Sequence, residues 1–527
     1  MDVSTAPVLA ALLVVLVSAL LIRAVVLLVW RPFAVTRWFR GQGVGGPGYS
    51  FFVGSMPEIK RMKAAGSAVV LDAGSHDFIP IVQPHFRKWI TNYGKTFVYW
   101  FGAVPTVCVA DMEVVKQVLA ERTGLFPKNN MNANLEALLG KGLVLTNGDD
   151  WKRHRKVVHP AFNLDKLKEM TVVMVHCAQK MMQQWQSQIG QSSNHQAEVE
   201  LSSEFSELTS DVISHTAFGS SYMEGKEVFL AQRELQELAF SASLNIPVPG
   251  HLRKWKLPTS SRDLRVRKLD SKVRSMLMAI IEGRLAEKDA KGGYGNDLLG
   301  LMLEARALEQ DDGHQMLSTQ EIVDECKTFF FAGQDTTSHL LTWTMFLLGR
   351  YPEWQEKLRE EVLRECGDAV PNTDMVNKLK LVNMVLLETL RLYSPVVIIQ
   401  RAAGSDLQLG GVRVPNGTML SIPIATLHRD TDVWGPDAGE FNPARFEHGV
   451  SRAAPGHPNG NALLSFSQGP RACIGQNFAM LEARLAVAMI LQRFSLALSP
   501  AYVHAPKEAI TLMPRFGLPM VLRSLRA

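Results

Sequence analysis

The most hydrophobic part of the 527-residue chain lies at its start. Residues 7–30 are apolar except at two positions, and a helix of this length spans a hydrocarbon core of roughly 30 Å. Asp2 precedes the apolar run, and three arginines follow it within residues 31–40. The positive-inside rule therefore predicts one membrane-spanning helix, with the N-terminus in the lumen and the remaining chain in the cytosol. A cleaved signal peptide is the alternative, and the basic cluster after the run, instead of before it, argues against it.

A second pattern predicts the longest helix of the chain, from Ser318 to about Arg350. Ser318 and Glu321 form an S-x-x-E capping box, and Pro352 supplies the stop. The middle of this helix, residues 332–337, reads AGQDTT. A glycine beside polar residues is a poor choice for a buried helix, and such a local violation often marks a functional position.

The remaining pattern predicts a mostly α fold with small β-sheets. Residues 97–100 and 106–109 are rich in β-forming residues around a Gly/Pro turn, which indicates a small hairpin. From residue 112 onward the apolar period is mostly helical. We expect three regions: an anchor (1–30), a basic, Gly-rich linker (31–50) and a catalytic domain (51–527).

Composition narrows the function without fixing it. Hydrophobic residues make up 46% of the chain, which is enough for a large core. The formal net charge is only +5, with acids and bases spread along the sequence, so no nucleic-acid-binding surface is indicated. The five cysteines show neither CxxC pairs nor zinc-finger spacing. A reducing compartment is therefore favoured for the main domain.

One cysteine stands in an unusual setting. Residues 466–475 read FSQGPRACIG, so Cys473 lies between two glycines and is followed by an apolar helical segment expected to begin near Ile474. A thiolate is a soft metal ligand. Gly469 and Gly475 permit tight bends and close approach of a flat ligand, and Arg471 can reach an acidic group on it. The alternative is a buried apolar thiol beside a turn, which is the usual role of a lone cysteine.

The pattern F-x-x-G-x-R-x-C-x-G resembles the haem-ligand loop of the cytochrome P-450 monooxygenases. The resemblance implies the cytochrome P-450 fold with an N-terminal transmembrane helix. It also implies haem b as cofactor, with Cys473 as the proximal iron ligand. Phe466, Arg471 and Gly475 would contact the haem.

The polar middle of the long helix fits the same family. Asp335 and Thr336 match its acid-alcohol pair, which implies a catalytic role in delivering the protons that oxygen reduction consumes. Ala332 and Gly333 would leave room for oxygen beside the haem. A helix kink with a satisfied threonine is the alternative. Residues 329–331, three phenylalanines, would floor the substrate pocket, with at least one of them facing the core.

Two further motifs follow in the order of the family. Glu388 and Arg391 form an E-x-x-R element, and Arg445 belongs to a P-x-R-F element, although Ala444 stands where the family often has glutamate. The resemblance implies that the three charged residues form a buried ion-pair network that locks the cysteine loop to the core. Their expected role is structural.

The last motif is basic. Trp151 and Arg155 match a W-x-x-x-R element that holds a haem propionate, and Arg401 and Arg471 would hold propionates too. Taken alone, the segment would be read as a solvated face. Its other bases are expected to be exposed and to dock an acidic electron donor: Lys152, Arg153 and Lys156.

The resemblance extends over nearly the whole chain and is strongest to the plant clan that hydroxylates fatty acids, terpenoids and hormones. Within that clan, the chain most resembles the subfamily of sub-terminal fatty-acid hydroxylases. It implies a monooxygenase that hydroxylates a lipophilic small molecule, with electrons from NADPH through a flavoprotein reductase, on the endoplasmic reticulum membrane. Cytokinin, brassinosteroid or gibberellin hydroxylation is the alternative, followed by a thiolate-haem isomerase or dehydratase and a haem sensor. Five segments would select the substrate: residues 129–145, 240–249, 329–331, 396–399 and 512–516.

Overall fold

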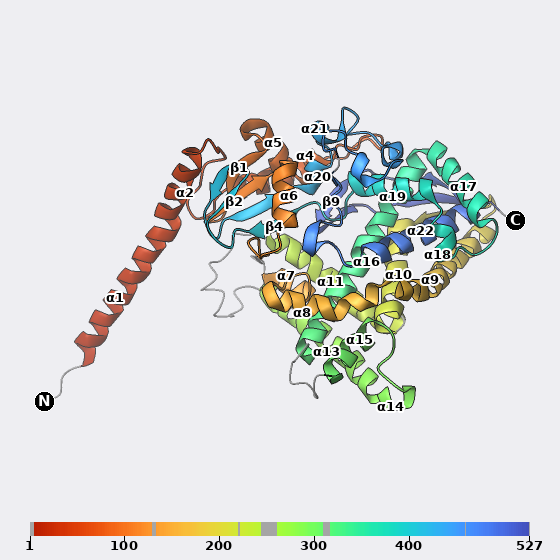
Figure 1. Cartoon of the computed structure of the whole chain (residues 1–527), viewed down its shortest axis with the longest axis horizontal. Coiled ribbons are helices and arrows are strands. Elements are labelled where there is room, and N and C mark those ends of the chain that lie inside the picture. The colour runs from red at the N-terminus through yellow and green to blue at the C-terminus, as the bar shows by residue number, and fades with distance from the viewer. Residues whose placement is uncertain are drawn as a thin grey trace.

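The computed structural model describes residues 5–128, 133–219, 222–243, 261–308, 317–458 and 460–525. Helices dominate this part of the chain, and small sheets lie at its edges (Figure 1). The helices of the first half are α1 (Thr5–Val25), η1 (Val26–Trp30), α2 (Arg31–Arg40), α3 (Met56–Ser67), α4 (Ile79–Val82), α5 (Pro84–Tyr93), α6 (Met112–Ala120), α7 (Ala133–Leu139), α8 (Gly148–Val158), η2 (His159–Phe162), α9 (Leu164–Gln191), α10 (Leu201–Phe218) and α11 (Tyr222–Ser243).

The second half continues with helices of very different length. They are α13 (Ser261–Ala286), α14 (Lys288–Lys291), α15 (Leu298–Leu308), α16 (Thr319–Arg350), α17 (Pro352–Cys366), α18 (Thr373–Val376), α19 (Lys380–Leu392), α20 (Ile424–Leu427), α21 (Thr431–Trp434), η3 (Pro443–Phe446), η4 (Val450–Arg452), η5 (Gly469–Arg471) and α22 (Gln476–Arg493).

The described residues form four small sheets, of which two join distant parts of the chain and two are local hairpins. The largest has the order β1-β2-β7-β4, and the others are β3-β11-β8, β5-β6 and β9-β10. Strands β1 and β2 form the predicted hairpin, with Thr96 opposite Val109. The strands are β1 (Thr96–Phe101), β2 (Val104–Val109), β3 (Gln196–Glu200), β4 (Ile399–Ala402), β5 (Leu407–Leu409), β6 (Val412–Val414), β7 (Met419–Ile422), β8 (Phe494–Leu498), β9 (Pro506–Ala509), β10 (Thr511–Pro514) and β11 (Pro519–Ser524).

The predicted long helix is α16, and it runs through the middle of the molecule (Figure 1). Ser318 is its N-cap, and the reciprocal bonds of the capping box with Glu321 are both present. Most of its residues are buried against neighbouring helices. A helix that is buried on every side is usually hydrophobic all round. The polar residues in the middle of α16 depart from this rule and therefore call for a functional explanation.

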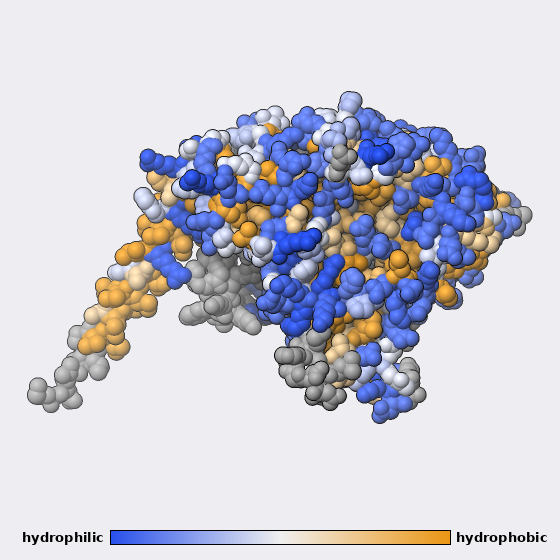
Figure 2. All heavy atoms as spheres, viewed as in Figure 1, coloured by the Kyte–Doolittle hydropathy of each residue, from blue (hydrophilic) through white to orange (hydrophobic). Residues whose placement is uncertain are grey.

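The N-terminal helix is longer than the apolar run that predicted it. A single helical span covers Val8–Arg40 without a break, and its apolar window has a mean hydropathy of 3.0 with no residue buried in the protein. It is long and apolar enough to cross a membrane. Figure 2 shows the continuous hydrophobic surface along α1 beside the more polar body.

The region expected to be a linker is ordered against the body. Its first ten residues form α2, in which Pro32 and Phe39 are buried. The Gly45 carbonyl then accepts a hydrogen bond from the Val98 N–H at 2.9 Å, so the glycine-rich part runs along strand β1.

Candidate active site

The loop that carries Cys473 is shaped by one glycine. Gly469 has φ +70°, and a Cβ added there would lie 2.1 Å from the Leu119 carbonyl oxygen, so no other residue fits. The Cys473 N–H donates to the Phe466 carbonyl at 2.8 Å. Helix α22 follows with Gly475 as its N-cap, two residues later than the sequence predicts.

Cys473 differs from the other four cysteines of the chain. Those four are buried, whereas the Cys473 thiol is accessible. Burial by the surrounding protein nevertheless raises the pKa of the Cys473 thiol, while the Gly475 N–H, Arg155 and Lys128 act in the opposite direction. Its accessible surface therefore faces an interior space, where those positive groups favour the thiolate.

Four cationic side chains gather near this sulfur. Arg155 donates to the Ala472 carbonyl at 3.0 Å, and Arg471 donates to the Thr146 carbonyl at 2.7 Å. Burial lowers the pKa of Arg401 to about 10. It lowers that of Arg471 to about 10 as well, with Arg401 and Arg155 adding to the effect.

Lys128 is the fourth cation, and no sequence motif singles it out. Its ammonium donates to the Val144 carbonyl at 2.6 Å. Burial, followed by the charges of Arg401 and Arg471, lowers its pKa to about 7, while Cys473 acts to raise it. A lone lysine before a loop carries no motif, and only the fold reveals its neighbours.

No member of this cation cluster (Lys128, Arg155, Arg401 and Arg471) forms an ion pair with a carboxylate in the described part of the chain. The indole of Trp151 lies beside the cluster, 4.5 Å from the Arg471 guanidinium and 6.0 Å from that of Arg155. Charges withdrawn from water need a counter-charge. An apolar disc with two carboxylates supplies one, so the residues present fit a haem.

The polar middle of α16 interrupts an otherwise buried surface. Ala332, Gly333 and Thr336 are only half-buried, and the Thr336 hydroxyl donates to the Ala332 carbonyl at 2.7 Å. Asp335 is directed elsewhere, because its Oδ2 accepts from Thr511 Oγ1 at 2.5 Å and from a glutamine amide of α11 at 3.1 Å. The structure therefore places the predicted acid and alcohol on adjacent residues with separate partners.

The glycine of this segment has a packing explanation. A Cβ at Gly333 would lie 2.7 Å from Ile213 Cδ1 on α10. The close approach of α10 and α16 thus accounts for glycine at this position, which differs from the oxygen-room explanation predicted for it.

The E-x-x-R element forms a fully buried network. Arg391 binds Glu388 with two parallel bonds of 2.7 and 2.8 Å, and Arg445 Nε lies 3.2 Å from the same carboxylate. Arg391 also donates to the His428 carbonyl at 2.7 Å, and the His428 ring accepts from the Leu464 N–H at 2.9 Å. The network is thereby connected to the start of the cysteine loop.

Comparison with known proteins agrees with this geometry. The family model described as "Cytochrome P450" matches residues 78–516. Cytochrome P450 709B1 of Arabidopsis thaliana is 45% identical over 519 residues, which cover 97% of this chain and 98% of that protein. Cytochrome P450 709B3 of the same plant is 44% identical over 99% of both chains, and cytochrome P450 CYP72A616 of Paris polyphylla is 41% identical over the full length of both.

The chain belongs to the cytochrome P450 family. It is therefore a haem-thiolate monooxygenase, whose haem b activates oxygen with electrons that come from NADPH through a reductase. As predicted, the fold is mostly helical with small sheets and an N-terminal apolar helix. The recognition from the cysteine loop is confirmed.

One expected docking base of this cytochrome P450 is already paired. Arg153 is half-buried and binds Glu321 at 2.5 Å, so the expectation that it is exposed is wrong. Lys152 and Lys156 are exposed, and Lys152 lies 2.8 Å from Asp149.

The expected substrate segments have different surroundings. Phe330 is fully buried and stacks on Phe218 at 4.1 Å, so it is a core residue. Phe516 is 55% exposed and faces away from the interior. Residues 129–132 and 244–249, from two of the expected segments, lie outside the described residues.

Proposed function

We propose that this cytochrome P450 hydroxylates a lipophilic small molecule, a fatty acid or a hormone- or terpenoid-like compound. The observation that carries this proposal is the alternation in the segment before β4. Val396 and Ile398 are half-buried, whereas Val397 and Ile399 are buried. Alternate residues of an extended segment face the same way, so Val396 and Ile398 share one partly accessible apolar face, and Val397 and Ile399 share the buried one.

Aromatic and aliphatic groups of other elements extend this apolar environment. Phe329 of α16 stacks on Phe162 at 5.6 Å, and Val144 and Leu145 are half-buried in the core cluster. A highly charged substrate would find few partners among such groups.

We further propose roles for the residues around Cys473. The Cys473 thiolate ligates the haem iron, the loop residues Phe466 and Gly475 lie against the macrocycle, and Arg471 binds a propionate. Trp151, Arg155 and Arg401 would complete the propionate site, and Ala332 and Gly333 of α16 would also contact the haem. The support is the cation cluster without carboxylate partners and the accessible thiol.

Asp335 and Thr336 are proposed to move protons. The Thr336 hydroxyl, which donates to the Ala332 carbonyl, would hold a proton for the oxygen substrate, and Asp335 would resupply protons from its partners on α11 and β10. The half-buried position of Thr336 and the buried position of Asp335 support this division of roles.

We assign the protein to the endoplasmic reticulum membrane, with a single span and the catalytic domain in the cytosol. The arginines after the apolar run support this orientation. A membrane-bound, NADPH-dependent flavoprotein reductase would then share the same surface and dock through exposed bases such as Lys156.

The substrate class is tested by titrating the full-length haem protein in lipid nanodiscs. Fatty acids, steroids, diterpenoids of the gibberellin type and adenine cytokinins are added separately while the Soret band is followed. Fatty acids or terpenoid-like compounds are expected to give a saturable shift. A shift with cytokinins alone, or no shift with any class, would contradict the lipophilic assignment.

The proton-transfer proposal is tested at Thr336. Thr336→Ala is expected to raise the NADPH consumed per product formed, because oxygen reduction continues without productive proton delivery. Thr336→Ser keeps the hydroxyl and is the matched control. Unchanged coupling in Thr336→Ala would remove this role, and product formed without NADPH would indicate an isomerase or dehydratase.

A further inference from the structure

The membrane-spanning helix continues along the catalytic body and is fastened to it. The indole Nε1 of Trp38 on α2 donates to the Arg413 carbonyl at 3.0 Å. The Gln42 side chain binds both backbone groups of Arg413, donating to the carbonyl at 3.2 Å and accepting from the N–H at 2.7 Å. Phe39, between them in sequence, is completely buried. Helix α2 and the β5-β6 hairpin therefore form a fixed pair.

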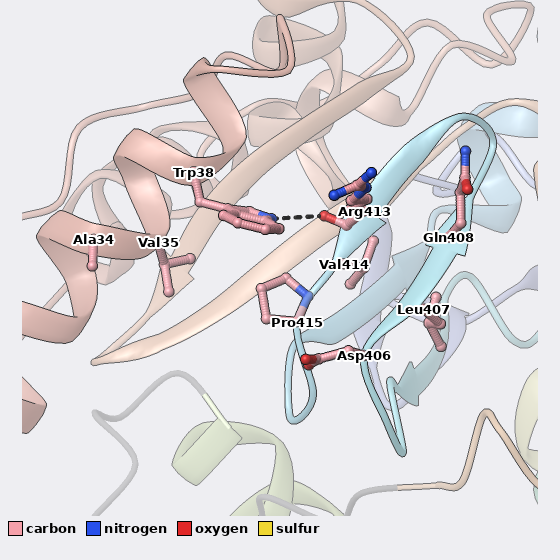
Figure 3. Close-up of a pocket in the computed structure, with 9 residues that line it drawn as sticks. All are labelled: Ala34, Val35, Trp38, Asp406, Leu407, Gln408, Arg413, Val414 and Pro415. Carbon is pink, nitrogen blue, oxygen red and sulfur yellow. Dashed lines mark hydrogen bonds between the residues drawn. The ribbon is translucent and has the colours of Figure 1, made fainter.

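An open groove of about 630 Å³ lies between these two elements (Figure 3). Val35 of α2 faces Val414 and Pro415 of the hairpin across it, as the close-up shows. A second groove of about 590 Å³ shares Trp38 and Arg413 with the first. The two grooves also share Ala34, so they meet where α2 lies against Arg413.

The charged groups of the grooves favour an anion. Arg37 and Arg413 are exposed, and neither forms an ion pair with a carboxylate in the part of the chain that the structure describes. Asp406 also lines the first groove, but its carboxylate accepts from the Asn416 N–H at 2.7 Å, at the open end of the hairpin away from its turn. The grooves therefore contain two arginines without carboxylate partners and one aspartate whose carboxylate is already hydrogen-bonded, which leaves a net positive charge.

The position along the membrane helix identifies the source of that anion. The apolar run ends at Trp30, which lines the second groove, and tryptophan is typical of the membrane-water interface. Trp30, Phe33 and Trp38 are 62%, 58% and 47% exposed. Large apolar side chains beside free arginines match the depth at which lipid headgroups meet acyl chains.

We propose that the two grooves bind an anionic phospholipid of the membrane that α1 spans. Its phosphate and headgroup contact Arg413 and Arg37, and an acyl chain lies along Val35 and Pro415. Because α2 and the hairpin are fixed to each other, a lipid held there also fixes the tilt of the catalytic body on the membrane.

The experiment uses the full-length haem protein in nanodiscs of phosphatidylcholine containing about one-fifth phosphatidylserine. The protein is released with a mild detergent, and the lipids retained on it are counted by native mass spectrometry. Arg413→Gln is compared with Arg523→Gln, which changes an exposed arginine two residues before the last described residue. The C-terminus lies at the opposite end of the molecule from α1 (Figure 1). Haem absorbance confirms that each variant is folded.

Phosphatidylserine is expected to be enriched over its share in the nanodisc, and Arg413→Gln to reduce that enrichment about fivefold, as expected for one basic residue at an anionic surface. Arg523→Gln should leave it unchanged. Retention in the bulk ratio, or equal enrichment in wild type and Arg413→Gln, would overturn the proposal. So would displacement of the lipid by soluble glycerophosphoserine, which would show that the headgroup alone is recognised.

Discussion

Several positively charged side chains lie near the Cys473 sulfur, and among them Lys128 has the most strongly lowered pKa. Its pKa of about 7 lies more than three units below the ordinary lysine value, because burial and the charges of Arg401 and Arg471 disfavour the ammonium. Haem propionates at this position would reverse that effect. The cation cluster is therefore built for an acidic occupant.

Lys128→Gln is expected to loosen the haem. A hydrogen bond to a charged group contributes about 1.5–3 kcal/mol, so haem should be lost at least about tenfold faster. The measurement is the rate of haem transfer to excess apomyoglobin. Lys152→Gln, on the exposed side of α8, is the control. Equal transfer rates in wild type and Lys128→Gln would exclude Lys128 from the propionate site.

At the scale of elements, the Glu388 carboxylate joins α19 to η3, because it binds both the Asn442 N–H and the Arg445 guanidinium. Glu388→Gln preserves the side-chain volume but removes the carboxylate paired with the buried Arg391, and it leaves Arg445 with Asp437 as its remaining carboxylate partner. The free energy of unfolding is expected to fall by about 3–5 kcal/mol, measured by denaturant titration. Glu234→Gln, which breaks the exposed pair with Arg265, should cost less than about 1 kcal/mol. Similar losses in both variants would refute the structural role.

A second buried ionic group holds α7 against α16. Lys327 is completely buried, and its ammonium donates to the Asp270 carboxylate and the Ala137 carbonyl. Thr328 donates to the Leu139 carbonyl at 2.7 Å. Three side chains from α13 and α16 thus position α7, which lies within the expected substrate segment of residues 129–145.

Lys327→Met should release α7 while leaving the rest of α16 packed. The Ala137 carbonyl loses its charged donor, so amide hydrogen exchange in α7 is expected to become about tenfold faster. Lys272→Met, which breaks an exposed pair between α13 and Glu227 of α11, is the control. Unchanged exchange in α7 would show that other contacts hold it.

Short sequence patterns predicted an element correctly where a local interaction alone determines it. The capping box fixed the start of α16, and the β-forming residues fixed the β1-β2 hairpin. Helix α2 was missed as an ordered element because its packing partner, Arg413, lies far away in the sequence. For Gly333 the sequence predicted room for oxygen, because the residue that makes glycine necessary there, Ile213, belongs to another helix.

Within the site, motifs identified the cysteine loop and three arginines, but not Lys128, since its role depends on which charges the fold brings together. Arg153 was wrongly expected to be exposed for the same reason, because its partner Glu321 lies at the start of α16. The sequence of one segment shows where its charged residues lie. Which of them form ion pairs depends on the tertiary fold.

At the scale of the whole molecule, buried neutral histidines make the protein sensitive to acid. Burial, with nearby arginines contributing, lowers the pKa of His76 and His428 to about 3, and burial lowers that of His504 to about 4. The His428 ring accepts from Leu464 N–H, and His76 lies 2.8 Å from the Tyr393 hydroxyl. These contacts hold the neutral rings in the fold.

The unfolded chain binds protons at these histidines near pH 6.5, whereas the folded chain does not. Stability is therefore fully present above pH 6.5 and falls as the pH drops toward 4, by up to about 4 kcal/mol per pH unit for the three groups together. His154 acts in the opposite sense: burial opposes its protonation, but Glu325 and Glu321 prevail and raise its pKa. Thermal unfolding midpoints measured from pH 7.5 to 4.5 should fall steeply below 6.5. A flat profile would contradict the neutral histidines.

The central claim is that the Cys473 thiolate holds the haem. The most direct measurement is the spectrum of the reduced carbon monoxide complex of wild type, Cys473→Ser and Cys366→Ser. The wild type and Cys366→Ser are predicted to show the strongly red-shifted Soret band that a thiolate ligand produces, and Cys473→Ser to lose it while remaining folded by circular dichroism. Survival of the band in Cys473→Ser, or its absence from folded wild-type protein containing haem, would contradict the assignment.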